Sequence, residues 1–276
     1  MSHKIASPGL IAALIITFNE EANISRTLDS LSWLSTILIV DSGSTDSTIS
    51  IASKYPSVEI AKRPFDTFAS QCNWGLSLLS TDWVLSIDAD YVISAELSQE
   101  ILKVITTSDD EIVGFSIPFR YCVWGRPLRG ALLPPRTSLY RTSAGVYRNE
   151  GHGHRLELPG IVSRLSSPIF HDDRKPLDRW LRSQHRYMLE EANNLLQTSS
   201  SKLSFADRLR KHSYLAPFVV FFLCLFWKGG LLDGRRGWSY ALQRMYAEIL
   251  LLLLLIDRKF HDGQKPHSTT TLKDNL

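Results

Sequence analysis

Two aspartates end an apolar run in the first third of the chain, and their chemistry suits a divalent-cation site. Residues 83–87 form a short run of bulky and partly β-branched side chains, which is typical of a buried strand in a parallel sheet. If that strand persists through Asp90, its period of two places Asp88 and Asp90 on the same side. Because an unpaired buried carboxylate is costly, the pair needs a cation, and hard oxygen ligands suit Mg²⁺ or Mn²⁺. The alternative is a solvated Asp-Ala-Asp loop, since this tripeptide is common.

Two further polar clusters follow apolar strands earlier in the chain. Asn19 and Glu20 come directly after the apolar stretch 10–18, and Asp41 comes directly after residues 37–40. In open parallel sheets, ligands bind outside the carboxyl ends of the strands. We therefore expect all three clusters to converge on one edge of a sheet.

The segments between these clusters predict the elements that must position them. Apolar residues at helical spacing predict helices over residues 24–34, 49–55 and 68–79. With a short strand over 58–61, the order is βαβαβαβ, which predicts an α/β fold with a mostly parallel sheet and helices on both faces. Gly43 allows a tight turn after the second strand, and Asp46 or a neighbouring hydroxyl can cap the next helix.

The absence of two nucleotide-binding motifs narrows the possible class of ligand. No Gly-x-Gly-x-x-Gly follows the first strand and no Gly-x-x-x-x-Gly-Lys-Ser/Thr occurs, which argues against a dinucleotide dehydrogenase or a phosphate-loop NTPase. A sugar-phosphate nucleotidyltransferase shares the layout, but it would need a glycine-rich basic loop where Asn19, Glu20 and Glu21 stand. A nucleotide held by acidic residues and a metal remains.

Composition and charge bound the class of protein. The 276 residues, 44% hydrophobic and 21% charged, indicate one large folded domain with an appendage. A net charge of +3 gives no argument for a nucleic-acid partner. Residues 120–155 hold seven arginines and a single acid, Glu150, which indicates an anionic ligand such as phosphate or else an ordinary solvated basic face. Three widely spaced cysteines fit a reducing compartment.

Three motifs together resemble the family 2 glycosyltransferases, which have a GT-A fold. They are Ile-Ile-Thr-Phe-Asn-Glu at 15–20, Ile-Val-Asp-Ser-Gly-Ser-Thr-Asp at 39–46 and Leu-Ser-Ile-Asp-Ala-Asp at 85–90. Their order and spacing are most similar to the lipopolysaccharide-core β-glucosyltransferase-like branch. The resemblance covers the first 90 residues and extends more loosely to about Gly237. Tyr91 departs from the pattern, because many relatives carry Glu after Asp-Ala-Asp.

The resemblance implies a nucleotide-sugar site at these positions. Asp41 would hydrogen-bond the base, expected to be uracil, and Asp88 would face the ribose and the metal. Asp90 would ligate Mn²⁺ or Mg²⁺ and so take part in catalysis, with His171 as a further metal contact. A metal there neutralises the departing diphosphate. The implied nucleotide-sugar site consists of Thr17, Asn19, Glu20, Asp41, Gly43, Asp46, Gln71, Asp88 and Ala89.

Sugar transfer also needs a carboxylate base that takes the proton of the acceptor hydroxyl. Glu150 is our candidate, because it is the only acid in the arginine-rich segment and this region resembles the family's acceptor-side loop. Asp172 and Asp173 are the rivals. Arg136 and His152 would lie on the acceptor and phosphate side.

The last third of the chain turns helical and contains two apolar blocks. Residues 214–227 carry no charge over fourteen positions, fewer than the roughly 20 needed to span a bilayer, and residues 249–256 form a shorter block. Flanking cations and tryptophans suit helices in the interface of an anionic membrane. The alternative is a pair of helices that bury each other or form a dimer contact. We expect a catalytic domain over 1–175, a membrane-interface helical region over 176–260 and a disordered tail over 261–276.

The sequence thus predicts a metal-dependent, inverting glycosyltransferase at the cytoplasmic face of a membrane, peripheral or monotopic. It would move a sugar from a nucleotide donor, expected to be UDP-linked, to a lipid-linked or polysaccharide acceptor of the cell envelope. Inversion is an implication of the resemblance. The non-enzymatic alternative is a membrane-associated scaffold that has kept the fold and lost activity, against which Asp41, Asp88 and Asp90 argue. Oligomeric state is left open.

Overall fold

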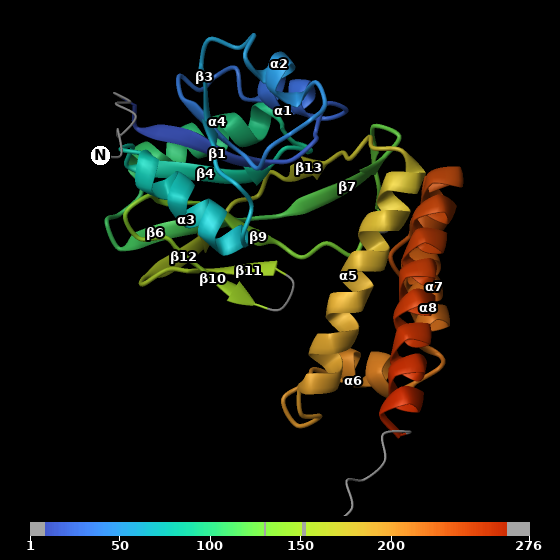
Figure 1. The fold of residues 1–276 in the computed structure, drawn as a ribbon. Coiled ribbons are helices and arrows are strands. Elements are labelled where there is room, and N and C mark those ends of the chain that lie inside the picture. The colour runs from blue at the N-terminus through green and yellow to red at the C-terminus, as the bar shows by residue number, and fades with distance from the viewer. Residues whose placement is uncertain (1–8, 130, 151–152, 264–276) are drawn as a thin grey trace, which may run out of the picture.

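The computed structural model describes residues 9–129, 131–150 and 153–263, and it has two parts (Figure 1). An α/β unit comes first, and a group of long helices stands beside it. The predicted fold class is confirmed. The tail from residue 264 onwards and His152 lie outside the described residues.

A seven-stranded sheet forms the centre of the first part, in the order β12-β6-β9-β4-β1-β2-β3. Every neighbouring pair is parallel except those of β9, which runs antiparallel to β4 and β6. The register pairs Thr17 with Asp41 and Ile16 with Asp88, so the three polar clusters do meet at one edge. The strands are β1 (Ile11–Thr17), β2 (Ile37–Asp41), β3 (Val58–Lys62), β4 (Trp83–Asp88), β6 (Ile112–Ile117), β9 (Arg136–Arg141) and β12 (Ile161–Arg164).

Both faces of this sheet are buried, which explains why its central strands are almost wholly apolar. Ala13 and Ile15 face α1 (Ile24–Ser30), α2 (Thr48–Ala52) and α4 (Ala95–Thr107). Ala12 and Leu14 face α3 (Phe68–Leu78) and the hairpin of β10 (Val146–Glu150) and β11 (Gly153–Glu157). The predicted helices therefore cover both faces.

A second sheet, in the order β5-β13-β7-β8, was not predicted from the sequence. The strand β4 ends at Asp88, so the condition for Asp88 and Asp90 to alternate on one strand is not met. Ala89 and Asp90 form a turn, and the second sheet then pairs Tyr91 with His171. Its strands are β5 (Tyr91–Ile93), β13 (Ile169–His171), β7 (Phe119–Val123) and β8 (Arg126–Pro127).

The last helix of the second part is longer than the apolar block that the sequence indicated. The apolar block 249–256 belongs to one continuous helix, α8 (Arg235–Gly263), which runs past the predicted boundary at residue 260. Its inner side packs against α5 (Leu177–Gln197). The connecting elements are α6 (Phe205–His212), α7 (Ala216–Phe222), a π-helical turn (Leu223–Trp227) and a 3-10 turn (Gly230–Asp233). By length and composition alone α8 could cross a membrane, a test that core helices of soluble proteins also pass.

The beginning of α8 is joined to the second sheet. Val123 and Leu128 pack with Leu225 and Ala241, and Tyr240 Oη accepts a hydrogen bond from the backbone N–H of Leu132 at 2.9 Å. This junction holds the helices against the side of the α/β unit that carries β13.

Candidate functional site

The loops after β1 and β2 are clamped together by side-chain to backbone hydrogen bonds. Asn19 adopts a left-handed conformation (φ 57°), and its Oδ1 accepts from the N–H of Thr45 at 2.7 Å. The N–H of Glu20 donates to Thr48 Oγ1 at 2.7 Å. Asp46, which precedes the N-cap residue Ser47, accepts from the N–H of Thr48 at 3.0 Å at the start of α2. The two predicted nucleotide-binding loops therefore form one surface.

Asp41 lies at the floor of this surface and is only 1% exposed. Its carboxylate accepts from the backbone of Gly43 (3.0 Å) and Ser44 (3.0 Å) and from Ser44 Oγ (2.5 Å), and Thr17 Oγ1 lies 3.4 Å away. Gly43 has φ +93°, a conformation that favours glycine. In this structure Asp41 shapes its own loop, and its bond to a base stays a prediction.

Gln71 reaches the same loop from α3. Its Nε2 donates to Ser42 Oγ at 3.2 Å and to the carbonyls of Arg63 and Pro64, both at 3.1 Å. Its Oε1 is buried without a hydrogen-bond partner. A buried amide held in this way ties the β2–α2 loop to the segment before α3.

The turn after β4 gives its two aspartates different surroundings. Asp88 is exposed, whereas Asp90 turns inward. Thr27 Oγ1 donates to the carbonyl of Ala89 at 2.6 Å and fixes the turn from α1. Asp90 Oδ2 lies 3.2 Å from His171 Nε2 and 4.0 Å from Lys175 Nζ. The predicted neighbourhood of Asp90 and His171 is therefore present in the geometry, with a lysine that the sequence did not reveal.

Two aromatic rings orient His171. The ring of Tyr91 lies edge-on at 5.3 Å and that of Tyr121 at 4.9 Å. Tyr91, the departure from the family pattern, is buried and also packs against Phe119. Tyr121 continues to Tyr240 on α8 at 5.1 Å. An aromatic chain thus runs from the site to the second part of the molecule.

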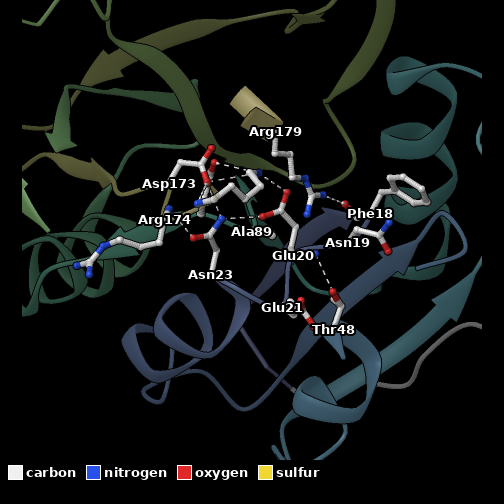
Figure 2. Close-up of polar contacts among 12 residues, drawn as sticks. Phe18, Asn19, Glu20, Glu21, Asn23, Thr48, Ala89, Asp173, Arg174 and Arg179 are labelled. Atoms are coloured by element: carbon white, nitrogen blue, oxygen red, sulfur yellow. Dashed lines mark hydrogen bonds and ion pairs between the residues drawn. The ribbon is translucent and has the colours of Figure 1, made fainter. Parts of the chain in front are cut away.

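A cluster of polar and charged side chains connects Glu20 and Asn23, near the start of α1, with Asp173 in the segment after β13 (Figure 2). Lys175 Nζ lies 2.7 Å from Glu20 Oε1 and 3.6 Å from Asp173 Oδ1. Asn23 Nδ2 donates to both Glu20 and Asp173 at 2.9 Å. Sequence reasoning missed Asn23 and Lys175, and the only available signal was the position of Lys175 just after the His-Asp-Asp-Arg segment.

The opposite charges in this cluster shift one another's pKa values toward the ionised forms. Burial lowers the pKa of Lys175, but the carboxylates of Glu20, Asp90 and Asp173 outweigh it and raise that pKa above its usual value. Burial raises the pKa of Asp90, but His171 and Lys175 outweigh it and hold that pKa below its usual range. Burial raises the pKa of Glu20, and Lys175 only partly offsets this. Asp90 therefore stays ionised at neutral pH.

The donor atoms around Asp90 fit a cation that shares its shell with a ligand. Asp90 Oδ1 and His171 Nδ1 are buried without hydrogen-bond partners. Among the described residues, no three His, Cys, Asp or Glu side chains lie close enough together to hold a metal ion by themselves. A divalent cation held here would need oxygens from water or substrate phosphates, which is the usual habit of Mg²⁺.

Comparison with known proteins decides the class. The sequence profile described as Glycosyl transferase family 2 matches residues 12–156, more than half of the chain. The chain belongs to this glycosyltransferase family. The predicted family and enzyme class are confirmed.

This family 2 glycosyltransferase has relatives over most of its length. It is 27% identical, over 88% of this chain and 89% of the relative, to the lipopolysaccharide core biosynthesis glycosyltransferase LpsC of Rhizobium meliloti (strain 1021). It is 26% identical, over 71% of each chain, to an uncharacterized glycosyltransferase of Rickettsia prowazekii (strain Madrid E).

Similar solved structures include a mannosyltransferase, PcManGT of Pyrobaculum calidifontis, in complex with GDP-Man and Mn²⁺. It is 14% identical with a TM-score of 0.48, over 92% of this chain and 88% of that one. S. aureus TarS 1–349 in complex with UDP-GlcNAc is 15% identical with a TM-score of 0.46, over 93% of each chain.

The β10–β11 hairpin and the segment after β13 carry the residues predicted to act on the acceptor. Tyr147 Oη donates to Ser86 Oγ at 3.0 Å, which anchors the hairpin beside β4. Glu150 ends β10, and its side chain lies outside the described part. Arg136 begins β9 and is exposed. Its charge reaches Tyr91, where it partly offsets the burial that raises the pKa of that phenol.

Asp172 and Asp173, the two rival candidates for the base, differ in their ion-pair and hydrogen-bond partners. The carboxylate of Asp172 is buried and receives two hydrogen bonds from Arg174 Nε at 2.9 and 3.0 Å, while Arg26 Nε lies 3.5 Å away. Such a locked ion pair suits a structural role better than proton transfer. Asp173 is held by Asn23 and Lys175, as described above.

Proposed function

We propose that this glycosyltransferase transfers a sugar from a UDP-sugar to a lipid-linked or polysaccharide acceptor of the cell envelope. Transfer would proceed with inversion at the anomeric carbon and would depend on Mn²⁺ or Mg²⁺. The observation that carries the proposal is the ionised, largely buried Asp90, which has an unpartnered oxygen at the sheet edge where the nucleotide loops meet. A relative named for lipopolysaccharide core biosynthesis supports the envelope role.

The donor would lie across the surface formed by the β1–α1 and β2–α2 loops. Thr17, Asn19 and Glu20 border this surface, with Asp41, Gly43, Asp46 and Gln71 shaping its floor. Hydrogen bonds within the protein tie these loops together, so little ordering free energy would be needed on binding. A rigid floor of this kind is suited to discriminating one base from another.

The leaving diphosphate would sit near the turn at Asp88, Ala89 and Asp90. Asp88, Asp90 and His171 would hold a divalent cation together with oxygens of water or substrate, and that cation would supply positive charge to the leaving diphosphate. Lys175 favours the ionised forms of Glu20 and Asp90, which lie 2.7 and 4.0 Å from its Nζ. Its ammonium adds positive charge on the same side of the site.

Glu150 is our proposed base for the acceptor. Its carboxylate would take the proton of the acceptor hydroxyl while that oxygen attacks the anomeric carbon, with Arg136 and His152 on the acceptor side. We expect Glu150→Gln to bind donor normally and to lower turnover by at least about a hundredfold. Near-normal turnover in that variant would show that another group acts as the base.

Residues 1–175 would bind and react with substrates. Residues 176–260 would hold the enzyme at the cytoplasmic face of a membrane, where a lipid-linked acceptor is presented. This division of labour explains why a charged, water-accessible site is joined to helices with large exposed apolar side chains.

Binding of a panel of nucleotide sugars, with Mn²⁺ and with chelator, tests the donor site. Wild-type protein should bind one UDP-sugar in a metal-dependent manner, and Asp90→Asn should lose that binding. Asp109→Asn, at an exposed aspartate before β6, is the matched control. If no nucleotide binds under either condition, the inactive scaffold becomes the better account.

A further inference from the structure

The outward side of α8 carries an unbroken row of large apolar side chains. The members recur every three or four residues and are each between 37% and 62% exposed. No charged residue interrupts the row. The α8 stripe consists of Trp238, Leu242, Tyr246, Ile249, Leu253, Ile256 and Phe260.

A shorter row lies beside it on α7 and the π-helical turn. The α7 stripe consists of Phe218, Phe222 and Phe226, which are four residues apart and at least half exposed. Phe222 and Phe226 stack at 5.8 Å, and Phe221 meets Trp238 of α8 at 5.9 Å. Together the two stripes make an apolar surface too large for an ordinary water-facing helix pair.

The other side of α8 shows that this helix cannot enter a bilayer end-on by itself. Glu248, at its middle, is only 4% exposed and lies 3.0 Å from Arg210 Nε, and Arg210 Nη1 lies 2.6 Å from Glu191 of α5. Spanning would carry these ions and the charged face of α5 into hydrocarbon, which is costly. Only the stripe side is free of charge, so a bilayer can meet α8 from the side alone.

Cations and aromatic residues stand at the ends of the surface. Lys228, Arg235 and Arg236 lie around the start of α8, beside Trp227, which is 84% exposed. Arg258 and Lys259 lie near its end, next to Asp257. The stripe covers 22 residue steps, about 33 Å of helix. Cations and indoles around a long apolar face match the headgroup layer of an anionic membrane.

We propose that the α7 and α8 stripes lie flat in one leaflet of an anionic bilayer, with α8 parallel to the membrane plane. Membrane contact itself does not depend on the proposed function. Only the reason for it does, which is to bring a lipid-linked acceptor to the site. The aromatic chain from Tyr240 through Tyr121 to His171 places the proposed reaction site beside the start of α8. The acceptor hydroxyl would then enter from the membrane side.

Co-sedimentation of the full chain with vesicles tests the surface. Vesicles of phosphatidylcholine with 30% phosphatidylglycerol should bind wild-type protein, and Leu242→Gln/Leu253→Gln should weaken binding at least about 30-fold, because two half-buried leucines are lost. Arg235→Gln/Arg236→Gln should weaken binding about tenfold or more on these vesicles and little on pure phosphatidylcholine. Leu102→Gln/Lys103→Gln, at exposed positions of α4, is the matched control and should bind like wild type.

Depth measurements distinguish a flat helix from a crossing one. The native cysteines Cys72, Cys122 and Cys224 are buried, so nitroxides can be attached selectively to cysteines placed at 242, 249 and 256. A flat helix gives three similar, shallow depths. A crossing helix gives depths that differ along the roughly 21 Å between the outer labels, and that result would overturn the proposal.

A second copy of the chain is the competing occupant of the surface. Sedimentation without vesicles should show a monomer. A dimer that Leu242→Gln/Leu253→Gln dissociates, together with unchanged vesicle binding, would assign the surface to self-association. Vesicle binding requires neither donor nor transfer, so a chain that binds vesicles but transfers no sugar refutes the proposed function alone.

Discussion

Lys175 Nζ lies 2.7 Å from Glu20 Oε1, although 155 positions separate the two residues along the chain. The contact joins the loop after β1 to the residue that precedes α5 by two positions. Since Asp90 and Asp173 lie within 4.0 Å of the same ammonium group, one lysine balances three carboxylates. The sheet edge where the polar loops meet is therefore completed by the segment that leads into α5.

Removing this lysine should destabilise the fold as well as the site. Lys175→Met leaves Glu20 without its ion-pair partner and leaves Asp90 with His171 alone, and breaking a buried ion pair costs about 3–5 kcal/mol. Urea unfolding should show this loss, while Lys54→Met, at an exposed lysine, should unfold like wild type. An unchanged unfolding midpoint for Lys175→Met would mean that the cluster is solvated.

Asn23 should be sensitive to charge more than to size. It is fully buried and donates to Glu20 and Asp173, while its Oδ1 accepts from the N–H of Arg174 at 2.9 Å. Asn23→Asp replaces a donor by a third carboxylate, and we expect a loss of about 2–4 kcal/mol in unfolding free energy. Asn23→Ser, which keeps a donor and adds no charge, should lose clearly less in the same measurement.

The backbone of Asn19 allows strain to be separated from hydrogen bonding. Its φ of 57° is available to glycine without cost. Asn19→Gly and Asn19→Ala both lose the side-chain bond to Thr45, but alanine adds about 1 kcal/mol of left-handed strain. Thermal unfolding should therefore rank wild type above Asn19→Gly, and Asn19→Gly above Asn19→Ala. Equal stabilities for the two variants would contradict the assigned conformation.

Glu100 on α4 should make stability depend on acidic pH. Burial raises the pKa of Glu100, but hydrogen bonds from the backbone N–H groups of Ser166 (2.8 Å) and Ser167 (2.9 Å) outweigh it and lower that pKa below the usual 4.5. A depressed pKa stabilises the fold above the unfolded value, and this contribution is lost as pH falls through the folded value. The advantage of wild type over Glu100→Gln in urea unfolding should thus be constant near neutrality and shrink below about pH 4.5. A difference that does not vary with pH would be evidence against these bonds.

Local sequence determined the part of the main sheet formed by β1 to β4, whereas β6, β9 and β12 were not predicted. Strands β1, β2 and β4 are short apolar runs that end in polar residues, and the helices between them have a clear apolar face. Strands joined by βαβ connections run parallel, so their carboxyl ends lie at the same edge of the sheet. The meeting of Asn19, Asp41 and Asp88 at that edge therefore followed from the pattern alone. The three motifs also sufficed to name the family.

Tertiary structure decided what completes that edge. Strands β5 and β13 are three residues each, too short to show a period, yet their pairing puts His171 beside Asp90. A single lysine or asparagine has no local signal for the partner it will meet 150 residues away, so Lys175 and Asn23 could not be predicted. The apolar blocks of the last third were visible, but which side of α8 remains exposed depends on its packing against α5. Periodicity specifies that a helix has an apolar face, and only its neighbours specify which part of that face is left exposed.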